Sequence, residues 1–521
     1  MSSDLHTLDF DAVRRILRRL TSTPYGSEAA EALAPASDLA AAERMQAAVS
    51  AARRLLERGD LASIEPIVDI RGALRQAAGP GAILTSQAFF NISAVLRAVG
   101  VLRPLLADEP ALCPLGESAL EPPPGLLATL DRTLDGPGAV ARDASTELAE
   151  LNRVRAQLRT RAESLAEQRC ARPDLSDCMG RGRSLRWQSG RAVLEVPDAV
   201  ASTIRGVRRG VGAGGRSTLF EPMELVGTNN DLEIVETRMQ REERRVLHDL
   251  TTVLRQHLGA LHGLIEALTW TDLAFAAGRL SSRFNCSAPE LVLDPGVILD
   301  QAYNPLLLLQ AENGQLPKPP VPLTLSLGPN LPLILITGPN TGGKTVALKT
   351  VGLLVAMAQC GLHIPSEGAC VIGWYRRVMV DVGDRQSLYH RLSTFAGHVE
   401  VLKRILVEAD RHTLVLLDEL GTGTDPEEGA ALAMAVLDEL LDRGTHAIVT
   451  THLSPLKTYA LDRERVTSAA MAFDHDSMSP TYRLRVGDTG ASLGLAIAGR
   501  NGLPDTVLDR ARAHLSRLHR H

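Results

Sequence analysis

The sequence lacks the features of several protein classes. Its six cysteines are scattered without a CxxC pair, which argues against a zinc ribbon and a disulfide framework. No uninterrupted apolar run of about 18 residues marks a membrane span. The N-terminus shows no basic-then-apolar signal pattern. These absences predict a cytoplasmic protein with reduced thiols and no membrane partner.

An excess of positive charge is also lacking. The 521-residue chain has 56 basic and 61 acidic residues, which gives a formal net charge of -5 at pH 7. The chain therefore has no overall positive charge that would indicate nucleic-acid binding. Any such binding has to rely on a local basic patch. Hydrophobic residues make up 45% of the chain and charged residues 22%. This balance allows a large core and predicts several domains.

The first half of the chain has helical periodicity. Residues 1–138 are rich in Ala, Leu and Arg, and their apolar positions recur every three to four residues, which predicts an all-α N-terminal core domain. In the charged stretches 139–170 and 229–270, spacings of three and four alternate, as in a coiled coil. The apolar positions are Leu148, Leu151, Leu158, Ala162 and Leu165 in the first stretch, and Leu247, Leu250, Leu254, Leu261, Leu264 and Leu268 in the second.

These two stretches predict the arms of an antiparallel coiled-coil hairpin that carries an insert at its far end. The alternative is that the two stretches are helices of one compact bundle. Arg155 and His257 interrupt the apolar seam, which keeps this alternative open.

The insert, residues 171–228, predicts a small β-containing module with a local basic patch. Residues 191–196 alternate like a strand, and glycines mark turns. Between residues 181 and 216, eight arginines stand against two acidic residues, a balance of +6. The arginines are Arg181, Arg183, Arg186, Arg191, Arg205, Arg208, Arg209 and Arg216. If four of them contact phosphates, affinity falls with salt at a log–log slope of about -3.6. A solvated face of an arginine-rich protein is the alternative.

The remainder, residues 271–521, alternates β-branched or Leu-rich runs with helical patterns, which predicts an α/β domain. A buried strand at 331–337 leads into a full match to GxxxxGK[ST], and a helix follows. The match consists of Gly338, Pro339, Asn340, Thr341, Gly342, Gly343, Lys344 and Thr345. In such a loop, backbone N–H groups surround the β-phosphate, Lys344 reaches the β- and γ-phosphates, and Thr345 ligates Mg²⁺. The motif predicts ATP and Mg²⁺ as ligands.

Two further strand ends complete the expected site. The apolar run 413–417 is followed by Asp418 and Glu419, which we expect at the strand edge beside the phosphate loop. Asp418 would hold Mg²⁺ through water, and Glu419 would orient and activate the attacking water. His452 follows another strand, where we expect a switch histidine that senses the γ-phosphate, although a lone histidine is more often structural.

Together these motifs resemble the MutS ATPases of the ABC superclass. The resemblance also rests on Leu392-Ser393-Thr394-Phe395, on Gly421-Thr422-Gly423-Thr424-Asp425-Pro426 and on Thr450-Thr451-His452. The type-two MutS branch is indicated by Gly383-Asp384-Arg385-Gln386-Ser387 and by Leu219-Phe220-Glu221-Pro222-Met223.

The resemblance implies an ABC-type ATPase and dimerisation domain, and a homodimer. Each ATP would lie between one phosphate loop and the partner subunit's Ser393. Gln386 would link the nucleotide to the arms, and Asp425 would lie in a loop that crosses the dimer interface. The arms would act as levers, and the basic insert as a clamp.

Three departures from the family pattern modify this expectation. The N-terminal domain has no Phe-x-Glu, so mismatch recognition is disfavoured. The sequence stops at His521 without the Smr nuclease usual in the branch, so nuclease activity is not expected. Ala302-Tyr303-Asn304-Pro305-Leu306 stands where the branch has Arg-His-Pro, so Tyr303 either stacks on adenine or is a core tyrosine.

The leading hypothesis is a dimeric ATPase that clamps branched or distorted DNA, with ATP-driven switching, in recombination control or DNA repair. The alternative from the same resemblance is a factor that grips stalled or collided ribosomes, contacting rRNA, and splits them. The basic insert suits either partner, because phosphate contacts carry little sequence information. A regulatory module with little turnover is a third class, and the intact Lys344, Asp418 and Glu419 count against it.

Overall fold

The computed structural model describes most of the chain in two compact units. The described residues are 2–59, 67–113, 120–176, 185–212, 217–338, 343–382, 394–474, 479–488, 498 and 502–518. Unit 1 consists of Met1–Ile64, Leu105–Glu117 and Glu266–His521, and unit 2 of Glu65–Pro104 and Ser118–Ile265. The predicted N-terminal domain 1–138 is therefore divided between the two units instead of forming one of its own.

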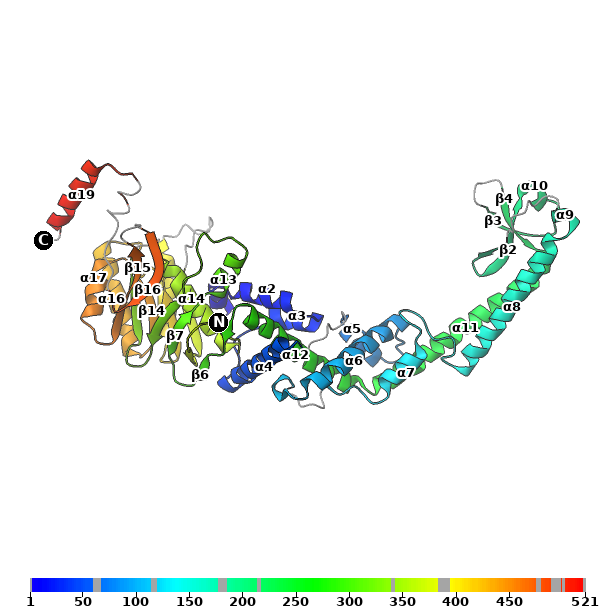
Figure 1. Ribbon diagram of the computed structural model, residues 1–521, viewed down its shortest axis with the longest axis horizontal. Helices are drawn as coiled ribbons and strands as arrows, with labels where there is room; N and C mark the ends of the chain where they lie inside the picture. Colours follow the sequence, from blue (N-terminus) through cyan, green and yellow to red (C-terminus); the bar gives the residue numbers. More distant parts are fainter. Residues whose placement is uncertain are drawn as a thin grey trace. The chain divides into compact units, whose positions relative to one another are not determined.

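Unit 1 is built on a six-stranded sheet with the order β12-β13-β14-β9-β15-β16 (Figure 1). The first five strands are parallel to their neighbours, and β16 is antiparallel to β15. The strands are β9 (Leu333–Thr337), β12 (Arg377–Asp381), β13 (Thr413–Leu417), β14 (His446–Thr450), β15 (Val466–Asp474) and β16 (Ser479–Val486). Because the carboxyl ends of parallel strands share one edge, the residues that follow β9, β13 and β14 lie close together.

Both faces of this sheet are covered. On β9, Ile334 and Ile336 enter a core shared with α14 (Lys344–Gln359), whereas Leu333 and Leu335 face the opposite core. Helices α15 (Thr394–Glu408), α16 (Pro426–Asp442) and α17 (Ser454–Leu461) supply that second core. Strands buried on both faces explain the uninterrupted apolar runs in the sequence.

The first helices of the chain pack onto α14 and not into a separate domain. Leu8, Phe10 and Leu17 belong to the same core as α14. Nearly every residue of α14 is buried, and a helix that is apolar all round needs cover on every side. The helices involved are α1 (Ser2–Thr7), α2 (Phe10–Leu20), α3 (Pro24–Glu31) and α4 (Leu39–Arg58).

A smaller sheet completes unit 1, with the order β6-β11-β7-β8. Its strands are β6 (Glu290–Val292), β7 (Val297–Ala302), β8 (Leu323–Leu327) and β11 (Val371–Gly373), and the short strands β5 (Cys286–Ser287) and β10 (Ile364–Pro365) pair beside it. The other helices are η1 (Pro110–Leu112), α13 (Pro305–Glu312) and α19 (Asp505–Leu518), and α12 (Leu258–Arg283) runs across the unit boundary.

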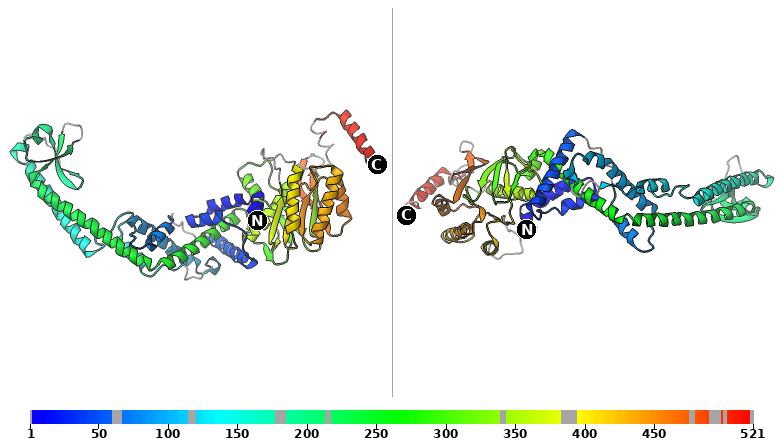
Figure 2. Two further views of the ribbon diagram at one scale, coloured as in Figure 1. Left: turned by 180° about the vertical axis from the view of Figure 1, so that it is seen from behind. Right: turned by 90° about the horizontal axis from the view of Figure 1, so that it is seen from below.

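In unit 2, helices α8 (Thr146–Cys170) and α11 (Met223–Arg255) form an antiparallel pair (Figures 1 and 2). Ser145, which caps α8, donates to Glu242 Oε1 at 2.7 Å, and at the other end Arg169 Nε lies 3.4 Å from Glu224 Oε1. The apolar seam between them contains Leu148, Leu151, Val235, Met239 and Val246.

The second predicted arm, 229–270, differs from the structure. Two helices replace one, because α11 ends at Arg255 and α12 begins at Leu258. The seam predicted at Leu247–Leu268 is also displaced toward the C-terminus, because the residues of α11 that pack against α8 are Val235, Met239 and Val246. Antiparallel pairing sets the first part of α11 against α8, while its last turns meet α5 (Arg71–Ala78), where Arg255 Nε donates to Ala77 O at 2.9 Å.

The insert folds as a four-stranded antiparallel sheet, here called the clamp sheet, with the order β1-β2-β4-β3. Its strands are β1 (Leu185–Gln188), β2 (Arg191–Pro197), β3 (Gly206–Val211) and β4 (Ser217–Pro222), accompanied by α9 (Pro173–Ser176) and α10 (Asp198–Ala201). Leu194, Val196 and Phe220 on one face pack against Ala162 and Ala166 of α8.

Helix α6 (Ser86–Leu106) has the length and apolar composition of a membrane-crossing helix, the one such helix found in the described residues. Half of its most apolar stretch is buried inside the protein, and core helices of soluble proteins have the same composition. The remaining helix of unit 2 is α7 (Leu126–Thr133).

Candidate nucleotide site

The predicted phosphate loop joins β9 to α14. Pro339, Asn340, Thr341 and Gly342 lie outside the described residues, and Gly338 and Gly343 flank them with φ angles of 125° and 93°. Glycine adopts such angles at little cost, which explains its use at both hinges of the loop. Helix α14 starts at Lys344, so the free N–H groups of its first turn form an anion site beside the loop.

Lys344 lies inside this loop. Its side chain donates from Nζ to the carbonyl oxygen of Gly338 at 2.6 Å, and the residue is 1% exposed. Burial lowers the pKa of Lys344, and the nearby charges of Glu419 and Asp418 oppose that shift. A buried cation of this kind favours an anionic partner, as a phosphate-binding lysine must.

The two predicted magnesium ligands meet. Thr345 Oγ1 donates to Asp418 Oδ2 at 2.7 Å, which joins the start of α14 to the end of β13. A hydroxyl and a carboxylate are hard oxygen donors of the type that Mg²⁺ takes together with phosphate oxygens. These two residues therefore fit the ion. No group of three or more His, Cys, Asp or Glu side chains within the described ranges forms a separate metal site.

Thr450 contacts the carboxylate of Asp418 and the backbone of Glu419, and sequence reasoning missed its role. Its hydroxyl donates to Asp418 Oδ1 at 2.5 Å and accepts from the backbone N–H of Glu419 at 2.8 Å. The parallel register of β13 and β14, with Leu417 opposite Val449, places Thr450 beside Asp418. The signal was present as a threonine at the end of the neighbouring strand, but only the register shows what it contacts.

Glu419 has a strained backbone. Its φ angle is 54°, in the left-handed region that costs a residue other than glycine about 1–3 kcal/mol. Two bonds to Thr450 hold it there, one through the hydroxyl and one in which Leu420 N–H donates to the Thr450 carbonyl oxygen at 3.1 Å. These two bonds hold the backbone of Glu419 in place next to Asp418.

A second pair of polar residues supports the end of β13. Asp381, the last residue of β12, accepts the Asp418 N–H on its carbonyl oxygen at 2.8 Å. Its carboxylate accepts from His398 Nδ1 of α15 at 2.8 Å. A cavity of about 20 Å³, with room for a single water molecule, lies among these residues and Glu419. Sequence reasoning identified neither Asp381 nor His398.

A larger cavity of about 500 Å³ lies beside the first turn of α14. Its lining includes Asn304, Gly343 and Tyr482. Tyr303 is not part of this lining, and its hydroxyl donates to Glu367 at 2.7 Å instead. The structure therefore offers Tyr482, not Tyr303, as the aromatic ring beside the phosphate loop.

The other predicted site residues have mixed outcomes. His452 is exposed in the loop after β14, and Asp425 caps α16 by accepting from the N–H of Glu427 at 2.9 Å. Gln386 and Ser393 lie outside the described residues. The roles predicted for these four residues stay predictions.

Of the eight clamp arginines, Arg181, Arg183 and Arg216 lie outside the described residues. Arg186 pairs with Glu195, and Arg191 and Arg209 pair with the buried Glu221. Arg205, just before β3, and Arg208, within β3, are exposed, and neither has an ion-pair partner within the described part of the chain. The predicted patch is therefore not uniform.

Known proteins match both the site and the whole chain. Residues 334–519 match the family model for MutS domain V. Endonuclease MutS2 of Symbiobacterium thermophilum is 36% identical over 98% of this chain and 63% of its own length. Endonuclease MutS2 of Pelotomaculum thermopropionicum is 36% identical over 99% of the chain and 65% of its own length, and that of Thermus thermophilus is 36% identical over 99% and 66%. The chain thus spans slightly less than two thirds of these relatives.

Proposed function

Because this chain belongs to the MutS family, in its MutS2 branch, we propose that it is an ATPase that acts on DNA in recombination or repair. In finer terms, the proposed protein is a homodimer. Its clamp sheets hold branched or distorted DNA, and ATP binding and hydrolysis switch that grip. In this proposal, the nucleotide bound in unit 1 controls how the clamp arginines of unit 2 hold DNA.

The hydrogen bond of 2.7 Å between Thr345 and Asp418 carries the ATPase proposal. It brings a residue of the phosphate loop and a residue of the second acidic motif to one point, although 72 residues separate them in the sequence. Lys344 lies within electrostatic reach of Glu419 and Asp418, and Thr450 bonds to the Asp418 carboxylate and to the Glu419 backbone. This is the donor set that phosphoryl transfer to water requires.

Each residue has a separate task in this proposal. Lys344 binds the β- and γ-phosphates, and Thr345 and Asp418 hold the metal ion. Mg²⁺, when bound, neutralises charge on the phosphates. Glu419 orients the attacking water and takes its proton, and His452 contacts the γ-phosphate side from the next strand end.

Steady-state ATP turnover tests the catalytic role. Glu419→Gln keeps the size of the side chain and removes the base, so turnover should fall by about 100-fold or more, as for the loss of a general base. The matched control is Glu464→Gln at an exposed position away from the site. Equal rates for the wild type and Glu419→Gln would remove Glu419 from the catalytic role.

Gel shifts with a four-way junction, a linear duplex and a mismatched duplex test the DNA proposal. The expected order of affinity has the junction first, with no preference for the mismatch. Sedimentation with purified ribosomes tests the alternative partner. ATP-dependent co-migration with ribosomes, combined with no preference for the junction, would replace the DNA proposal by the ribosome proposal.

Light scattering tests the dimer. The proposed site needs the partner subunit's Ser393, so the active species should have twice the mass of one chain. A monomer with full ATPase activity would contradict a site shared between two copies.

A further inference from the structure

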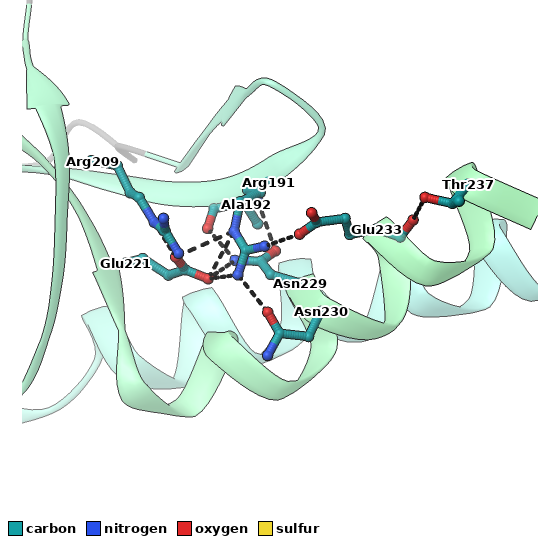
Figure 3. Close-up of polar contacts among 8 residues, drawn as sticks. All are labelled: Arg191, Ala192, Arg209, Glu221, Asn229, Asn230, Glu233 and Thr237. Atoms are coloured by element: carbon teal, nitrogen blue, oxygen red, sulfur yellow. Dashed lines mark hydrogen bonds and ion pairs between the residues drawn. The ribbon is translucent and has the colours of Figure 1, made fainter. Parts of the chain in front are cut away.

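Glu221 of β4 is a buried anion in the clamp sheet. Its residue exposure is 0%, and three side chains donate to its carboxylate (Figure 3). The donors are Arg191 Nη2 at 2.7 Å, Arg209 Nε at 2.5 Å and Asn229 Nδ2 at 2.7 Å. Burial alone would raise the pKa of Glu221, but these hydrogen bonds outweigh it and lower the pKa. A buried carboxylate persists only with such partners, so Arg191 and Arg209 are needed where they are.

Asn229 fastens the sheet to helix α11. In the β2–β4 register Leu194 lies opposite Phe220, which brings Ala192 opposite Pro222, a residue without an N–H. Asn229 replaces the missing ladder partner. Its Oδ1 accepts from Ala192 N–H and its Nδ2 donates to Ala192 O, both at 2.9 Å. The side-chain amide thus continues the strand pairing from a helix.

Arg191 extends this connection along α11. Nη1 donates to Glu233 at 2.6 Å and Nη2 to Asn230 at 2.8 Å, and the side chain is 14% exposed (Figure 3). We call Arg191, Arg209, Glu221 and Asn229 the clamp joint. Its arginines already have counter-charges, so they have little to offer a phosphate group.

The edge strand β3 differs from the joint. Arg208 on this strand and Arg205, the residue before it, are exposed, and no carboxylate among the described residues pairs with either one. Val207 between them is 39% exposed. Charged side chains on an edge strand discourage pairing with a strand of another chain, which keeps this edge open. Guanidinium groups without counter-charges match phosphate oxygens in both charge and geometry.

We propose that Glu221 divides the clamp arginines into two classes: Arg191 and Arg209 are held in the clamp joint, and Arg205 and Arg208 on the β3 edge contact the phosphate backbone of a DNA duplex. This assignment rests on the proposed DNA binding and deepens it. The described part of the patch supplies two phosphate contacts, which contribute about -1.8 to the log–log salt slope. The joint fixes the position of that edge on α11.

The salt dependence of DNA binding tests the division. The probe is a linear DNA duplex, measured by fluorescence anisotropy across a salt series without ATP. Arg205→Gln and Arg208→Gln should each make the slope shallower by about 0.9, and the double variant by about 1.8. Arg209→Gln should leave the slope unchanged. Arg132→Gln, at an exposed arginine of α7 in the same unit, is the matched control and should also leave it unchanged.

Hydrogen exchange of β2 and β4 provides a second measurement. Glu221→Gln, Asn229→Ala and Arg209→Gln should lose protection in these strands, because each removes part of the joint, and Arg209→Lys should regain some of it. Arg205→Gln and Arg208→Gln should keep wild-type protection. Loss of protection in the β3 variants would show that these arginines belong to the joint and would overturn the division.

The outcomes separate this inference from the proposed function. If the wild type binds the duplex and the double variant keeps the wild-type slope, the division is wrong and DNA binding stands. An equal change for Arg209→Gln and Arg205→Gln would also overturn the division. If the wild type binds no duplex at low salt, the DNA proposal itself fails. The same measurements are repeated with an RNA duplex of the same sequence. If the salt slope depends on Arg205 and Arg208 for RNA but not for DNA, the assignment to DNA is wrong.

Discussion

The hydroxyl of Thr450 donates to Asp418 Oδ1 across 2.5 Å, from the strand next to the one that Asp418 follows. The same hydroxyl accepts the N–H of Glu419. One side chain thereby orients the carboxylate of the proposed metal ligand and holds the backbone of the proposed base. A hydrogen-bond partner such as Thr450 orients a metal-binding carboxylate that could otherwise rotate.

Thr450→Val should impair the ATPase without unfolding the protein. Valine has nearly the same shape but cannot donate to Asp418 or accept from Glu419. We expect ATP turnover or Mg²⁺ affinity to fall by about 10- to 100-fold, the usual effect of losing a residue that orients a metal ligand. Turnover measured across a Mg²⁺ titration gives both quantities.

The matched control for that experiment is Thr467→Val on β15 of the same sheet. The Thr467 hydroxyl is buried and has no hydrogen-bond partner among the described residues. Its replacement should be neutral or slightly stabilising, because no bond is lost. Equal turnover in the two variants would contradict an orienting role for Thr450.

Gly352→Ala should destabilise unit 1. A β-carbon at Gly352 of α14 would overlap the side chains of Leu8 and Leu416. Overpacking a core in this way costs about 1–3 kcal/mol of unfolding free energy, to be measured by chemical denaturation. At Gly397 of α15 nothing lies within 4 Å of the added carbon, so Gly397→Ala should instead stabilise its helix. Equal stability changes in the two variants would contradict the tight packing at Gly352.

Tyr482→Ala should weaken ATP binding if the cavity beside α14 receives the adenine. Tyr482 lines that cavity, and a base stacked on an aromatic ring gains about 1–3 kcal/mol. The KM for ATP should therefore rise by about 10-fold with little change in kcat. Tyr303→Ala removes a ring that does not line this cavity and should leave KM unchanged. A larger effect for Tyr303→Ala than for Tyr482→Ala would restore Tyr303 as the adenine-side residue.

The stability of unit 1 should depend on pH through two buried histidines. Burial lowers the pKa of His363 and of His446 to about 4. In the unfolded chain a histidine takes up its proton near a pH of about 6.5. Between these values the unfolded chain binds more protons, so the free energy of unfolding should fall as the pH falls from about 6.5 to about 4.

Denaturation at several pH values in this window measures the effect. In His446→Gln, the decrease in the free energy of unfolding across this pH range should be smaller by about 1–3 kcal/mol, because the variant has no imidazole at position 446 to be protonated on unfolding. His262→Gln replaces an exposed histidine and should leave the fall unchanged. A pH profile identical in the wild type and His446→Gln would show that this imidazole does not contribute.

The sequence identified the residues that meet at the candidate nucleotide site, because each motif combines residue type with local order. A strand, a glycine-rich turn and a helix occur consecutively, so Lys344 and Thr345 needed no knowledge of the rest of the fold. Thr450 could not be assigned in the same way. Its function depends on the pairing of β13 with β14, which the residues around it do not encode.

The clamp and the arms show the same limit. Alternation and glycine turns predicted a β module that is rich in arginine, but only the sheet shows that Arg191 and Arg209 share the buried Glu221. The heptad spacing continues through both halves of α11, and it cannot tell which turns meet α8. Likewise, the apolar faces of the first helices did not reveal that α14 is their partner.

The order of synthesis differs from the order in which the two units can fold. Unit 2 consists of residues 65–104 and 118–265, and both segments precede the strands of the six-stranded sheet, so unit 2 can fold while those strands are still being made. Leu8 packs in the same core as Leu416, and Asp4 accepts from Arg404 Nη2 at 2.9 Å. Helices α1 and α2 are therefore synthesised long before the residues that they pack against, and they need protection from aggregation until those residues emerge from the ribosome.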